Sequence, residues 1–96
     1  MTAEQMREIV ENSKEMAEAK EQCAQFLTEF EQKAKKKAEN GETEIVFCAD
    51  GDPSKCAQIF FHTENKHTKT LIKQKLYCEG YGVKTYCNGY RLSISW

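Results

Sequence analysis

The polar and apolar residues of the first forty positions follow a helical pattern. This stretch contains no glycine or proline and is dominated by Ala, Glu, Lys, Gln and Met, all of which favour helices. Thr2 and Gln5 form a capping-box pattern at its start, and Asn40-Gly41 supplies a stop at its end. The pattern therefore predicts one long amphipathic helix over residues 1–40.

One face of this predicted helix carries a heptad-like seam. Its positions alternate in steps of three and four: Met6, Ile9, Ser13, Met16, Lys20, Cys23, Leu27, Phe30 and Ala34. Ser13 and Lys20 interrupt the seam, so the repeat is weaker than that of a committed coiled coil. A helix of about 37 residues is about 55 Å long, whereas a compact globule of this chain length is about 32 Å across. We therefore expect the helix to overhang and to form an oligomer with a second copy through the seam residues Met6, Ile9, Met16 and Cys23.

A strand and a second helix are predicted after the long helix. The segment Glu44 to Ala49 contains β-forming residues on both faces, which indicates a central strand. Asp52-Pro53 then predicts a helix cap followed by proline at the first helical position, and helical spacing continues from Cys56 to Leu76. A competing interpretation makes residues 56–62 a strand that pairs with the first one.

Asn88-Gly89 between two alternating stretches predicts a hairpin with a two-residue turn. The resulting register places a set of residue pairs on one inner face: Cys87 with Tyr90, Thr85 with Leu92, Val83 with Ile94 and Tyr81 with Trp96. The other face carries Lys84, Tyr86 and Arg91, with Tyr86 directly across from Arg91. These three residues are a candidate binding patch, although aromatic residues in a small sheet more often belong to its core and edges.

Together these elements predict an α+β fold. A long N-terminal helix is followed by the order β-α-β-β, with a small three-stranded sheet and a C-terminal hairpin. The expected organisation is an oligomerising helix over residues 1–40 and a small α+β domain over residues 41–96.

Charge argues against generic nucleic-acid binding. The net charge of −1 divides into −5 for residues 1–32, +1 for residues 33–44 and +3 for residues 45–96. An excess of three positive charges over the last segment is far from the dense basic face that phosphate-backbone binding needs. No apolar run exceeds the five residues Ile45 to Ala49, so we expect no membrane partner and no membrane-spanning helix, and a cytoplasmic protein.

The residues that could carry chemistry do not form a motif. Five cysteines cannot all pair within one chain, and their spacing from one another and from His62 and His67 lacks the close pairs of a zinc site. Asp50-Gly51-Asp52 lacks the later ligands of a calcium loop. We therefore predict no catalytic residues, no metal and no cofactor, and a protein that is not an enzyme.

The order of elements resembles that of small uncharacterised accessory proteins of phages and prophages in Gram-positive bacteria. The motif that carries this resemblance is Gly80-Tyr81-Gly82-Val83 followed by Ile94-Ser95-Trp96. The resemblance implies a setting, phage–host interaction in the cytoplasm of the host cell, rather than a reaction. The expected function is a non-enzymatic accessory protein that oligomerises and binds a host component, with inhibition of a defence factor as one form of that function. The alternative is a small protein that binds nucleic acid or a signal nucleotide.

Overall fold

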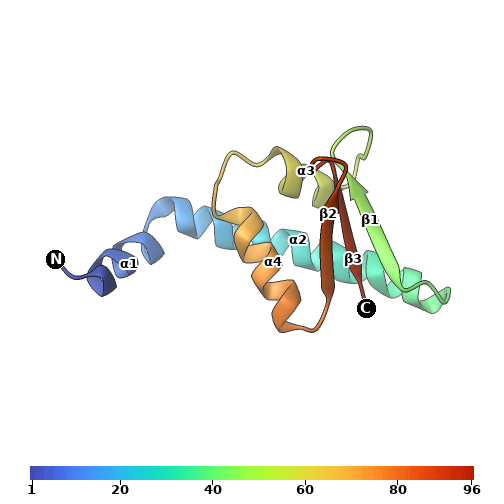
Figure 1. Cartoon of the computed structure of the whole chain (residues 1–96), viewed down its shortest axis with the longest axis horizontal. Coiled ribbons are helices and arrows are strands. Elements are labelled where there is room, and N and C mark those ends of the chain that lie inside the picture. The colour runs from blue at the N-terminus through green and yellow to red at the C-terminus, as the bar shows by residue number, and fades with distance from the viewer.

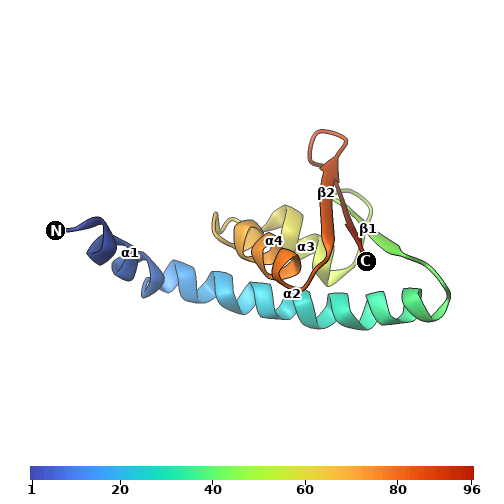
Figure 2. The ribbon, with the colours of Figure 1, turned by 60° about the horizontal axis from the view of Figure 1, so that its bottom comes forward.

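The computed structural model describes residues 1–96 and confirms the α+β class. Along the chain it contains four helices and three strands (Figure 1): α1 (Ala3–Glu11), α2 (Lys14–Glu39), β1 (Glu44–Cys48), α3 (Lys55–His62), α4 (Thr68–Cys78), β2 (Gly82–Tyr86) and β3 (Arg91–Ser95). The molecule measures 52 × 26 × 22 Å, and its long axis follows α2 with α1 extending beyond it (Figure 2).

The prediction of one continuous N-terminal helix is wrong at Asn12 and Ser13. Ser13 has an extended backbone, and its Oγ accepts a hydrogen bond from the Met16 N–H at 3.1 Å, which caps α2. The same hydroxyl donates to the carbonyl oxygen of Val10 at 2.7 Å, at the end of α1. One serine therefore ends the first helix and begins the second.

The predicted second helix is also divided, into α3 and α4. The preferred interpretation of one helix from Cys56 to Leu76 is wrong at the loop after His62, and the strand alternative is wrong because residues 56–62 are helical. The Thr63 hydroxyl accepts from the Asn65 N–H at 3.2 Å, and the Asn65 side chain accepts from the His67 N–H at 3.0 Å. These local bonds satisfy the backbone outside a helix and so end α3.

The loop between α3 and α4 is held on α2 by two side-chain amides, those of Gln22 and Asn65. The Oε1 atom of Gln22 accepts hydrogen bonds from the hydroxyls of Thr63, at 2.8 Å, and Thr68, at 2.7 Å. The side-chain amide of Asn65 donates to the backbone oxygen of Glu15. Thr68 is fully buried, so these bonds fix α4 against α2 while satisfying polar atoms that have lost water.

The sheet has the order β1-β3-β2, with both neighbours antiparallel to β3. The central strand is therefore β3, and the prediction that Glu44 to Ala49 is central is wrong. Burial alternates along β1 and β3, so that one sheet face meets the helices and the other is open. Val46 on the open face is 38% exposed, which explains why β1 looked apolar on both sides although only one side is covered.

The hairpin has the predicted register. Thr85 pairs with Leu92, Val83 with Ile94 and Tyr86 with Arg91. The sheet pairing ends at Tyr86 and Arg91, so the predicted two-residue turn and the predicted pair of Cys87 with Tyr90 are wrong. The connection runs over residues 87–90, and Cys87 (53°), Asn88 (57°) and Gly89 (85°) all have positive φ angles. The predicted contact between Tyr81 and Trp96 is also present, with ring centroids 6.5 Å apart.

The predicted inner face of the hairpin is only partly buried. Leu92 and Ile94 are fully buried, whereas Thr85, Cys87 and Tyr90 are exposed. The tip of the hairpin rises beyond the helices, so nothing covers these three residues (Figure 2).

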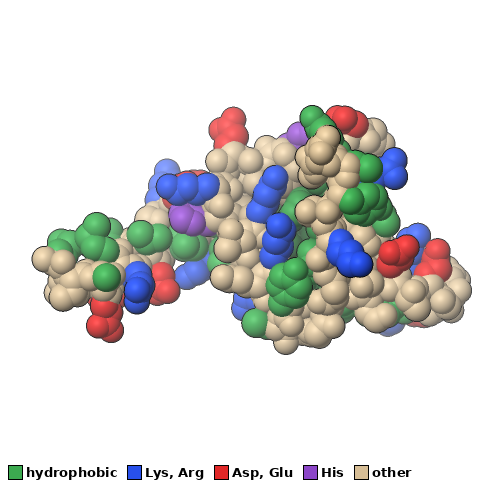
Figure 3. Space-filling model, viewed as in Figure 1, with side chains coloured by type: hydrophobic (Ala, Val, Ile, Leu, Met, Phe, Trp, Pro, Cys, Tyr) green, Lys and Arg blue, Asp and Glu red, His purple; other side chains and the backbone are tan.

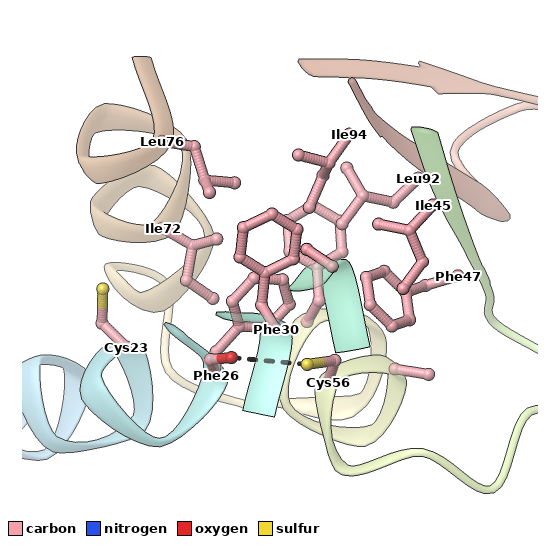
Figure 4. Close-up of a cluster of buried hydrophobic side chains, with 13 residues drawn as sticks. Cys23, Phe26, Phe30, Ile45, Phe47, Cys56, Ile72, Leu76, Leu92 and Ile94 are labelled. Carbon is pink, nitrogen blue, oxygen red and sulfur yellow. Dashed lines mark hydrogen bonds between the residues drawn. The ribbon is translucent and has the colours of Figure 1, made fainter. Parts of the chain in front are cut away.

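One hydrophobic core joins α2, the sheet, α3 and α4 (Figure 4). It contains 13 buried residues: Cys23, Phe26, Phe30, Ala34, Ile45, Phe47, Cys56, Ala57, Phe60, Ile72, Leu76, Leu92 and Ile94. Four of them come from α2, so this helix belongs to the same packed unit as residues 41–96. Only α1, which has no buried residue, stands apart from that unit.

Asp52 is not the helix cap that the sequence predicted. Ser54 caps α3 by accepting from the Ala57 N–H at 3.2 Å. The Asp52 carboxylate accepts from the N–H groups of Cys48, at 3.1 Å, and Ser54, at 2.9 Å, so it holds the turn between β1 and α3. Partial burial raises the pKa of Asp52, but these hydrogen bonds and nearby Lys33 outweigh it, and the pKa is lowered from its ordinary value of 3.8.

We expect Asp52→Asn to destabilise the protein at neutral pH, because an amide cannot accept hydrogen bonds at both positions. Loss of a hydrogen bond to a charged group costs about 1.5–3 kcal/mol. Because the pKa of Asp52 is lower in the folded state, its carboxylate stabilises the fold fully at pH values above 3.8. This stabilisation is lost as the pH falls below 3.8 and through the lowered folded-state pKa. The difference from wild type in urea unfolding should therefore be largest at pH 7 and should shrink below pH 3.8.

Asp50→Asn is the matched control, since Asp50 is exposed and the structure gives its side chain no hydrogen bond. It should leave the unfolding free energy unchanged over the same pH range. A constant difference between Asp52→Asn and wild type at every pH would contradict the ionic role of Asp52.

Candidate functional site

Three exposed apolar side chains lie together on α1. Met6, Ile9 and Val10 are 53%, 54% and 43% exposed, and we call these three residues the α1 apolar face. They follow the i, i+3, i+4 spacing of one helix face. Figure 3 shows hydrophobic side chains gathered along this projecting end of the molecule.

The sequence-predicted seam is divided between two environments. Met6 and Ile9 lie on the α1 apolar face, and Met16 is half-buried next to them at the junction of α1 and α2. Cys23 is only 4% exposed and belongs to the core, so it does not lie on an open seam. At Cys23 this face of α2 is covered by α4, so the seam residue belongs to the core.

A separate groove lies between α2 and α4. Its apolar floor is formed by Cys23, Ala24, Leu27 and Leu71, and its volume is about 490 Å³. Lys20, Lys75 and Glu79 form its rim. Leu27 and Leu71 are half-buried and pack against the core from this side. We call this feature the α2–α4 groove.

The candidate patch of Lys84, Tyr86 and Arg91 lies together on the open face of the sheet. Tyr86 and Arg91 are directly opposite each other on β2 and β3, and Tyr86 is 40% exposed. The cation–π contact of the structure lies outside this patch, with the Lys69 Nζ atom 5.3 Å from the ring centroid of Phe60. The patch is therefore assembled as predicted, with its side chains facing solvent.

The five cysteines are all free, and Cys48 is half-buried, between a buried pair and an exposed pair. Burial raises the pKa of Cys23, and it raises that of Cys56 to about 12, so both buried thiols stay protonated at neutral pH. The Cys56 thiol donates to the backbone oxygen of Phe26 at 3.4 Å, which makes it a packing residue (Figure 4). Cys78 and Cys87 are exposed.

The polar side chains that could have bound a metal ion do not form a site. The Nε2 atom of His62 is 2.9 Å from the backbone oxygen of Ala49, where it joins α3 to the end of β1. No group of three or more His, Cys, Asp and Glu side chains is arranged to hold a metal ion. No helix combines the length and apolar character needed to cross a membrane.

Sequence reasoning missed the α2–α4 groove. Its floor residues are separated by more than forty positions in the chain, from Cys23 to Leu71, and only the packing of α4 on α2 brings them together. The one signal in the sequence was the seam itself, which continues past Lys20 to Leu27.

Neither a family model nor a curated protein nor a solved structure matches this chain. The functional argument therefore depends on the surfaces of the molecule itself.

Proposed function

We propose that this protein is a non-enzymatic binding protein that self-associates through α1 and acts by binding a host component, as a phage accessory protein would. The observation that carries this proposal is the α1 apolar face, which projects from the folded unit with all three side chains about half exposed. A helix with one apolar face and no internal partner gains stability by burying that face against another protein surface. Inhibition of a host defence factor is the specific form of this function that we propose.

The arrangement of α1 supports a contact role over a structural one. Its N-cap Thr2 and Gln5 form a complete capping box, so the helix is stabilised locally without help from the core. The link to α2 is only Asn12 and Ser13, and α1 makes few contacts beyond it. A helix that is capped but not packed is well suited to meet a partner.

Self-association is tested by light scattering at micromolar concentration. We expect the wild-type protein to have twice the chain mass of 11.1 kDa, and Ile9→Glu to give a monomer, because a charge in an apolar contact loses its hydration. Gln5→Glu is the matched control, since it adds the same charge to α1 but keeps the capping box and replaces none of the three residues of the α1 apolar face. A wild-type monomer at all concentrations would refute self-association.

Host binding is tested separately with the same three proteins. A protein captured from a lysate of a Gram-positive host would then be purified and titrated with wild type, Ile9→Glu and Gln5→Glu. We expect saturable binding to the wild-type protein. The absence of any saturable partner would contradict the proposal.

A second candidate function is supported by the open face of the sheet. Lys84, Tyr86 and Arg91 could hold a base by stacking and a phosphate by charge. If this face binds nucleic acid or a nucleotide, Arg91→Ala should weaken binding of a single-stranded oligonucleotide, and raising the salt concentration should weaken it further. An oligonucleotide that binds equally to both proteins would remove this candidate.

A further inference from the structure

We infer that the α2–α4 groove of one copy receives α1 of a second copy, so that the two chains exchange their first helices. This inference rests on the proposed self-association and names the surface that α1 contacts. The groove offers an apolar floor of Ala24, Leu27 and Leu71, and α1 offers Met6, Ile9 and Val10 at the spacing with which a helix fits between two others. Both surfaces are open in the single chain.

Chain geometry excludes the same contact within one molecule. From Ser13, where the two helices join, Leu27 lies fourteen residues along α2, about 21 Å away at 1.5 Å per residue. Met6 lies only seven residues from Ser13 along α1, which is about 10 Å. Even if α1 folded back along α2, Met6 would reach no further than Lys20. The α1 apolar face therefore reaches Ala24 and Leu27 only in another copy.

An antiparallel arrangement of two chains forms this contact twice. If Ile9 of one copy lies beside Ala24 of the other, Met6 lies beside Leu27, because the residue numbers of two antiparallel helices run in opposite directions. Met16 then lies near the twofold axis, facing its own counterpart. Cys23 lies beneath the incoming helix as part of the groove floor. All four residues of the predicted seam thus belong to one interface, with Cys23 on its buried side.

The charges of the two surfaces are complementary. The rim of the groove carries Lys20, Lys75 and Glu79, a net charge of +1. The helix α1 carries three glutamates and one arginine, a net charge of −2. The ion pairs of the structure are Lys33 with Glu29 and Lys37 with Glu42, so the charges at the groove and on α1 are all unpaired in the single chain. A second copy brings opposite charges together along the rim.

Blocking the groove tests the inference. Ala24 is exposed in the single chain, so Ala24→Arg should fold normally but place a long charged side chain where Ile9 of the partner would lie. We expect its dimer dissociation constant, measured by sedimentation, to rise by about tenfold or more. Gln25→Arg is the matched control, because Gln25 is the next residue of α2, exposed and outside the groove.

Disulfide formation between two different chains gives a positional readout. One chain carries Ile9→Cys and the other Ala24→Cys, and both carry Cys78→Ser and Cys87→Ser to remove the exposed native thiols. We expect mild oxidation to join the two chains. Glu8→Cys, on the opposite side of α1, replaces Ile9→Cys as the control and should join far more slowly.

The outcomes separate this inference from the proposed function. A dimer that Ile9→Glu dissociates, but that Ala24→Arg leaves intact and that does not cross-link, would show that α1 pairs with another surface and would overturn only the exchange. Disulfide formation within a chain that carries both Ile9→Cys and Ala24→Cys would also overturn it, because α1 would then reach its own groove. A wild-type monomer would refute the proposed self-association and the exchange together.

Discussion

Replacement of Phe26 by alanine is expected to lower the free energy of unfolding by about 3–5 kcal/mol. The Phe26 side chain is fully buried and connects three parts of the core. Its ring centroid lies 6.3 Å from that of Phe30, 5.9 Å from that of Phe47 and 6.3 Å from that of Phe60. Its removal leaves a cavity where α2, β1 and α3 meet.

This loss of unfolding free energy is severe because small domains are only marginally stable. A domain is typically stable by about 5–15 kcal/mol, so Phe26→Ala removes a large fraction of the total. For a chain of this length each kcal/mol corresponds to about 4–8 °C in Tm. Thermal unfolding followed by circular dichroism would measure the change.

Val46→Ala provides the comparison for Phe26→Ala, because Val46 lies on the open face of the sheet and is 38% exposed. We expect it to change the unfolding free energy by less than about 1 kcal/mol. Equal losses for the two variants would mean that Phe26 does not occupy the centre of the core.

The hairpin could be predicted from sequence because its information is local. Asn88 and Gly89 both adopt positive φ, which few residue types tolerate, and the alternation on either side then sets the register. The long α2 was predictable for a similar reason, since helix-forming residues continue without glycine or proline until Asn40-Gly41.

The two helix breaks could not be predicted from helix propensity alone. Ser13 and Thr63 are acceptable inside helices, and each ends one here because its hydroxyl bonds to the nearby backbone. Whether a serine or threonine does so depends on what the next segment packs against. Gln22 on α2 accepts hydrogen bonds from Thr63 and Thr68, which lie more than forty residues away in the chain. The residues next to Thr63 in the sequence therefore do not predict this contact.

The strand order and the groove depend on contacts between distant parts of the chain. Glu44 to Cys48 is apolar enough for a central strand, but β3 has partners on both sides while β1 has one. The placement of Lys84, Tyr86 and Arg91 on one sheet face could be predicted because it needs only the hairpin register. The α2–α4 groove was not, because it needs the position of α4.

The central position of β3 makes its last residues important for the whole sheet. Ile94 is fully buried and pairs with Ile45 on one side and Val83 on the other. Ser95 likewise has a partner on each neighbouring strand. The backbone N–H of Trp96 donates to the carbonyl oxygen of Thr43 at 3.0 Å. Removal of these three residues would therefore shorten both strand pairs at once.

A chain that stops at Ser93 is accordingly expected to be largely unfolded at 37 °C. Loss of the buried Ile94 side chain alone costs about 2–5 kcal/mol, and each lost backbone hydrogen bond adds about 0.5–1.5 kcal/mol. A chain that lacks only Trp96 is the matched control. It loses a side chain that is 39% exposed and the bond to Thr43, so it should remain folded with a lower Tm.

Far-ultraviolet circular dichroism with urea titration distinguishes these expectations. The chain that stops at Ser93 should show no cooperative transition, whereas the chain that lacks only Trp96 should unfold cooperatively at a lower urea concentration than wild type. Because β1 has no strand partner other than β3, the sheet cannot rearrange to keep β1 paired when β3 is shortened. A cooperative transition at the wild-type midpoint in the chain that stops at Ser93 would therefore mean that β3 does not join β1 to β2.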